Sequence, residues 1–71
     1  NSTKIFIETP YRNNQLLESI LQHCQGNTKL CLGINITAKD ERIITLTVSN
    51  WKQRKPDLNK LPVVFLLYAG N

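Results

Sequence analysis

The stretch from Lys4 to Arg12 constrains the fold of this chain more than any other. It opens with β-branched and aromatic residues, which favour a strand, and Pro10 then ends the strand because proline has no N–H to donate to a sheet. Thr9 and Pro10 suit the start of a helix, since threonine can accept a hydrogen bond from a first-turn N–H and proline fits the first helical position. The stretch predicts a strand that ends near Glu8, then a tight turn into a helix.

The residues after this turn have the spacing of an amphipathic helix. Gly26 is expected to follow its end as the C′ residue, with His23 in the last turn. The turn itself carries Glu8, Tyr11 and Arg12 at the carboxyl end of a strand, where open α/β sheets often bind ligands. The apolar side chains that share one face of the helix are Leu16, Leu17, Ile20, Leu21 and Cys24.

Two alternating strands, a short helix and a last strand are predicted downstream. Lys29 to Ile36 alternates as a central strand, and Arg42 to Leu46 returns antiparallel to it after a polar connection. Thr47 fits as the N-cap of a helix to about Gln53, and the apolar run Val63 to Tyr68 is typical of a strand covered on both faces. The order β-α-β-β-α-β predicts an α/β domain, with a small mixed sheet of about four strands and helices packed on it.

Length and charge limit the function classes. The 71 residues make a single domain with one core, and no segment approaches the roughly 20 apolar residues of a membrane-spanning helix. The formal net charge of +4 permits an acidic partner, but the basic residues are spread along the chain. Lys52, Arg54 and Lys55 are the closest group. We interpret them as a solvated face, with phosphate contact as the alternative.

No self-sufficient catalytic or metal-binding motif is present. The chain has no glycine-rich phosphate loop, and one histidine with two separated cysteines does not make a zinc site. Cys24 and Cys31 are interpreted as reduced, buried thiols. Glu8 and Arg12 are four residues apart and either pair with each other or contact a ligand, and Trp51 is interpreted as a core anchor rather than a base-stacking platform.

The segment FIETPYR, residues 6–12, resembles a motif in the carboxyl-terminal domain of the tetrapyrrole methylase family of S-adenosylmethionine-dependent methyltransferases. In its ribosomal RNA branch a strand ends in Glu, a small residue, Pro, His or Tyr, and Arg. Later landmarks follow in the same order: a strand ending at Ile36-Thr37, a helix that begins after Thr47, and Pro62 before a last apolar strand. The branch's Ala-Arg-Glu before its Leu-Thr is replaced here by Gly-Ile-Asn at 33–35.

The resemblance implies that residues 1–71 are the carboxyl-terminal fragment of a larger two-domain enzyme, a cytoplasmic homodimer. S-adenosylmethionine would bind between the domains, and the methyl group would pass to a ribose 2′-hydroxyl of ribosomal RNA. The absent amino-terminal domain would hold much of the active site, so no catalytic residue or metal ligand is expected in this fragment.

The resemblance also assigns site residues. Tyr11 and Arg12 would face the substrate or lock the turn, and Gly33 would leave space on the ligand side. Two other readings stay open: a free-standing basic RNA-binding module, and a dimerisation domain without catalysis. The residues expected to contact the cofactor are Glu8, Asn35, Ile36, Pro62 and Val63.

Overall fold

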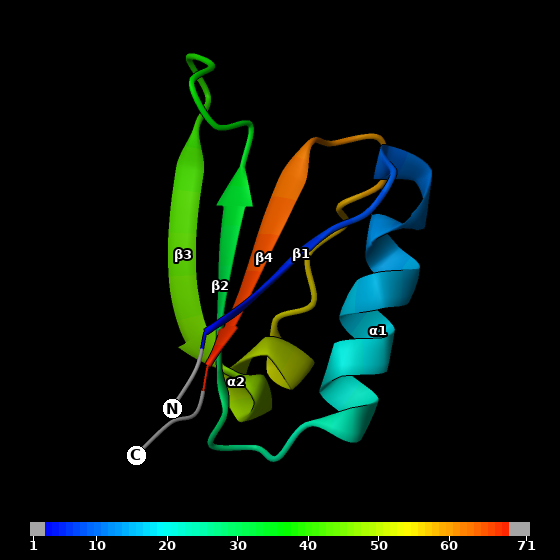
Figure 1. The fold of residues 1–71 in the computed structure, drawn as a ribbon, viewed down its shortest axis with the longest axis vertical. Coiled ribbons are helices and arrows are strands. Elements are labelled where there is room, and N and C mark those ends of the chain that lie inside the picture. Colours follow the sequence, from blue (N-terminus) through cyan, green and yellow to red (C-terminus); the bar gives the residue numbers. More distant parts are fainter. Residues whose placement is uncertain (1–2, 69–71) are drawn as a thin grey trace.

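A computed structural model describes residues 3–68, and its elements follow the expected order (Figure 1). The described residues form a small α/β domain with four strands and two α-helices, as the sequence predicts. A short 3-10 helix, Pro10–Arg12, leads directly into the first α-helix. The elements are β1 (Lys4–Ile7), α1 (Asn13–His23), β2 (Lys29–Ile34), β3 (Arg42–Thr47), α2 (Val48–Gln53) and β4 (Val63–Tyr68).

The four strands form one sheet in the order β1-β4-β2-β3, and every neighbouring pair is antiparallel. The expected mixed sheet is therefore an antiparallel one. The reason is that β4 lies between β1 and β2: Leu66 pairs with Ile5 on one side and with Cys31 on the other. β1 and β2 run in the same direction but do not pair with each other.

Both helices pack on the same face of the sheet (Figure 1). The core between them contains alternate residues of the strands, such as Leu32 of β2 and Phe65 of β4, which are fully buried. No described helix covers the other face, where Ile5, Ile7 and Ile43 are exposed. The expectation that β4 is covered on both faces is therefore wrong, although strands flank it on both edges.

The ends of α1 differ from the sequence expectation. The Thr9 side chain makes no cap hydrogen bond, and the Thr9 backbone N–H donates instead to Glu8 Oε1 at 3.0 Å. His23 lies in the last turn as expected, with Nδ1 2.8 Å from the Ser19 carbonyl oxygen. Gly26 is not in the left-handed conformation of a C′ glycine. It is close to Ser49 instead, because an added Cβ would lie 2.3 Å from the Ser49 Oγ.

A buried asparagine attaches the start of α1 to the loop before β4. Asn13 is fully buried, and its Nδ2 donates to the carbonyl oxygens of Leu58 and Leu61. Asn14 continues this contact, because its Oδ1 accepts a hydrogen bond from the Leu58 N–H at 2.8 Å. The polar loop is thus held by side-chain amides, and Leu58 itself is fully buried in the core.

The same loop contains a carboxylate whose protonation should affect stability. Hydrogen bonds from the Asn14 side chain and from the Asn59 N–H lower the pKa of Asp57 below its ordinary value. A carboxyl with a lowered folded-state pKa stabilises the protein above its unfolded pKa of about 3.9, and this contribution is lost as the pH falls through the folded value.

We therefore expect Asp57→Asn to reduce stability more at about pH 7 than at about pH 2, because the contribution of the wild-type carboxylate is lost as the pH falls below the unfolded pKa and through the lower folded one. Urea unfolding of both proteins across this range measures the difference. An equal loss at both pH values would contradict the assignment.

Candidate functional site

Three strand ends meet at one end of the sheet, the upper end in Figure 1. The carboxyl ends of β1 and β2 and the amino end of β4 lie there, because Ile7 is opposite Val64 and Ile34 is opposite Val63. The residues assigned to the cofactor follow or precede these ends directly. The structure therefore brings together Glu8, Asn35, Ile36, Pro62 and Val63.

A backbone hydrogen bond joins two of these residues. The Asn35 N–H donates to the Pro62 carbonyl oxygen at 2.9 Å, which extends the contact between β2 and β4 beyond the strands. The Asn35 side chain donates to Asp40 Oδ2 at 3.0 Å. Ile36 and Pro62 are exposed, whereas Val63 is 4% exposed and belongs to the core. Val63 can thus offer a ligand little besides its backbone.

Backbone strain is concentrated at this end of the sheet. Asn35, Thr37 and Lys60 have positive φ angles of 54°, 70° and 66°, and no other described non-glycine residue does. A β-branched residue such as Thr37 is rarely left-handed, and such conformations cost about 1–3 kcal/mol and often occur at functional sites. No sequence signal marks Thr37 or Lys60, since neither residue type favours this conformation.

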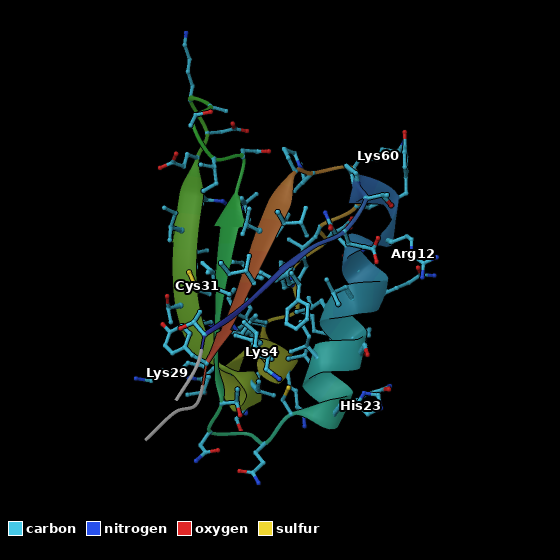
Figure 2. All side chains as sticks on the ribbon, in the orientation of Figure 1. Lys4, Arg12, His23, Lys29, Cys31 and Lys60 are labelled. Atoms are coloured by element: carbon cyan, nitrogen blue, oxygen red, sulfur yellow. The ribbon has the colours of Figure 1, made fainter. Side chains whose placement is uncertain are left out.

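The turn after β1 is tied to its neighbours. Glu8 Oε2 lies 3.7 Å from Arg12 Nε, so these residues form an ion pair. Pairing was one of the two roles expected for them, and contact with a ligand was the other. The Lys60 N–H donates to the Pro10 carbonyl oxygen at 3.0 Å, which joins the turn to the loop before β4. Tyr11 is 73% exposed, and Arg12 points outward, away from the sheet (Figure 2).

Gly33 does have a close neighbour on its second face, but that neighbour is part of the chain. An added Cβ at Gly33 would lie 2.9 Å from Ile36 Cδ1. Ile36 therefore occupies the space that was expected to face a ligand. Ile36 is itself 41% exposed. The apolar surface available at this end of the sheet therefore belongs to Ile36 and not to Gly33.

The basic residues Lys52, Arg54 and Lys55 do not form one patch. Lys55 Nζ lies 2.8 Å from Glu18 Oε2, and Lys52 lines the same cavity as this pair. Arg54 lines a different groove, beside β3. This separation weakens the interpretation of the three residues as a single phosphate-binding surface.

The remaining candidates have structural roles. The Trp51 Nε1–H donates to the Leu30 carbonyl oxygen at 2.8 Å, and the indole is buried, which confirms it as a core anchor. Cys24 and Cys31 are free; Cys31 is buried as expected, whereas Cys24 is only half-buried. Residues 3–68 contain no cluster of three or more side chains suited to a metal ion. In the same range, no helix has the length and apolar character needed to cross a membrane.

Comparison with known proteins adds no family assignment: no family model matches the chain, and the curated proteins contain no significant match. The site must therefore be judged on its geometry. At this end of the sheet Ile36 is exposed beside left-handed backbone, and the start of β4 lies between it and the ion-paired turn after β1. None of the cavities described here is lined by the five expected cofactor residues.

Proposed function

We propose that this chain is the carboxyl-terminal domain of an S-adenosylmethionine-dependent methyltransferase of the tetrapyrrole methylase family. The complete enzyme would act in the cytoplasm on ribosomal RNA and transfer a methyl group to a ribose 2′-hydroxyl. It would be a homodimer, as the resemblance implies. The chain alone would have no activity, because the opposite wall of the cleft would come from an amino-terminal domain.

The observation that carries this proposal is the convergence of Glu8, Asn35 and Pro62 at one end of the sheet. These residues are far apart in the sequence, and the register of β4 with β1 and β2 brings their strand ends together. The FIETPYR segment of the resemblance supplies one of the three strand ends. The left-handed residues Asn35 and Thr37 flank Ile36. Strained backbone of this kind is often found where a protein contacts a ligand.

The chain's own residues would position the methyl donor and exclude water from it. Ile36 offers apolar surface to the adenosyl group, and the backbone of Pro62 and Val63 continues the same wall. The bound cofactor would supply an electrophilic sulfonium methyl for the ribose oxygen, with S-adenosylhomocysteine as the neutral leaving group and the hydroxyl proton passing to water. Alignment and desolvation are the main contributions of a protein to such a transfer. The Glu8–Arg12 pair would hold the turn beside the substrate.

The test is methyl transfer by the complete gene product. The protein is incubated with small-subunit ribosomal RNA and with S-adenosylmethionine labelled on its methyl group, and the RNA is then hydrolysed with alkali. A 2′-O-methyl ribose blocks cleavage of the adjacent phosphodiester, so the label should appear in alkali-resistant dinucleotides. Absence of label, or label in mononucleotides, would contradict the proposed acceptor.

A further inference from the structure

Among residues 3–68, no strand pairs with the outer edge of β3. β3 ends the sheet order and pairs with β2, so one row of its backbone N–H and C=O groups faces outward (Figure 1). Natural edge strands are usually protected by proline, lysine, a bulge or short length. β3 has six residues, RIITLT, in continuous register with β2, and its single charge is Arg42 at the first position. The edge is therefore open to the addition of another strand.

A groove follows this edge on the face that carries the helices. It has a volume of about 200 Å³. Its floor contains Ile44 and Leu46 of β3, which stay half-buried and pack at the margin of the core. On the opposite face of β3, Ile43 is 62% exposed. An added strand would thus cover apolar surface on both faces of the sheet. The groove is lined by Ile34, Arg42, Ile44, Leu46, Trp51, Arg54 and Pro56.

The rim of the groove carries two guanidinium groups. Arg42 and Arg54 are exposed, and the ion pairs of the described residues involve neither of them. Two unpaired guanidinium groups above an apolar floor suit a ligand that combines carboxylates with an apolar side chain.

Charge argues against a second copy of this chain as the occupant. Antiparallel pairing of two β3 edges would bring both copies of Arg42 and Arg54 into one small interface. Each chain also has a net charge of +4, so the copies would repel each other. A nucleic acid would meet the guanidinium groups but has no strand backbone for the edge. An extended acidic protein segment suits the unpaired strand edge, the apolar floor of the groove and the two guanidinium groups.

We propose that the β3 edge and its groove bind an extended acidic segment of a partner protein by strand addition. Arg42, Ile44 and Leu46 occupy alternate positions of β3 and share one face. The bound segment would therefore place Asp or Glu beside Arg42, and an apolar residue two positions away over Ile44 and Leu46. Its backbone would continue the sheet. This inference is independent of the proposed methyl transfer.

A synthetic peptide tests the mode of binding. The probe is a short acetylated peptide with a central leucine, valines beside it and an aspartate two positions away on each side. Titrated into the isotope-labelled chain, it should shift amide NMR signals of β3 and the Arg54 loop saturably. Methylation of alternate peptide nitrogens removes the strand hydrogen bonds and should weaken binding at least about tenfold. No saturable shift, or equal binding by the methylated peptide, would overturn the proposal.

Charge reversals test the specificity. Arg42→Glu and Arg54→Glu should each weaken binding at least about tenfold, because each loses a charge-assisted contact. Lys39→Glu makes the same change of net charge at another exposed position and should change the affinity less than about twofold. An equal loss in all three variants would indicate non-specific attraction. Sedimentation of the free chain should give a monomer, and a dimer with its contacts at β3 would overturn the choice of partner.

Discussion

Asn13→Asp is expected to lower the free energy of unfolding by about 3 kcal/mol or more at neutral pH. The substitution keeps the size of the side chain but replaces its donor group with a carboxylate oxygen. That oxygen would face the carbonyl oxygens of Leu58 and Leu61, in a fully buried position. The Asn13 Oδ1 atom already lacks a hydrogen-bond partner, so the site offers no compensating donor. Urea unfolding followed by circular dichroism measures the change.

The pH dependence of the Asn13→Asp variant shows whether its loss of stability comes from the buried charge or from a general loss of packing. Burial against two carbonyl oxygens raises the pKa of the introduced carboxyl, so its penalty grows as the pH rises above about 4 and shrinks below it. Asn59→Asp adds the same charge at an exposed position of the loop and should change stability by less than about 0.5 kcal/mol. A neutral effect of Asn13→Asp at pH 7 would show that Asn13 does not hold the loop.

Trp51→Ala is expected to cost about 3–5 kcal/mol, which is most of the stability of a domain this small. Trp51 is 3% exposed and is the large residue with which the short helix α2 contacts the core. Trp51→Phe keeps an aromatic ring but loses the hydrogen bond to the Leu30 carbonyl oxygen, so its cost should be intermediate. Circular dichroism is the suitable probe, because both variants lose the single tryptophan.

Tyr11→Ala is the matched control, since Tyr11 is 73% exposed and its removal should change stability by less than about 0.5 kcal/mol. A cost below about 1 kcal/mol for Trp51→Ala would contradict its role as the anchor of α2. It would reopen the interpretation of the indole as a stacking surface.

Local patterns predicted the elements of this fold well. Alternation identified β2 and β3, although β2 ends at Ile34 and not at Ile36 as expected, and the spacing of apolar residues identified α1. The N-cap of α2 was also predictable, because Thr47 Oγ1 accepts a hydrogen bond from the Asn50 N–H as expected. Each of these features depends on residues that are close in the sequence, which is why the sequence alone reveals them.

The relative placement of elements that are far apart in the sequence was harder to predict. The insertion of β4 between β1 and β2 depends on pairings of residues far apart in the chain, so a mixed sheet was expected where an antiparallel one occurs. The burial of Asn13 has the same origin, because its hydrogen bonds join it to Leu58 and Leu61. The groove beside Arg42 and Arg54 was missed because its lining comes from three separate segments. The five cofactor positions were named from a resemblance, and the structure brings them together at one end of the sheet.

Calorimetry of the complete gene product with S-adenosylmethionine is the decisive test of the proposed cofactor site. We expect saturable binding that Ile36→Lys weakens at least about tenfold, because the variant puts a cation in the wall of the cleft and desolvating this cation is unfavourable. Ile43→Lys makes the same change on β3 and should leave the affinity within about twofold. No heat of binding to the wild-type protein, or equal affinity in the Ile36→Lys variant, would contradict the claim that this end of the sheet holds the methyl donor.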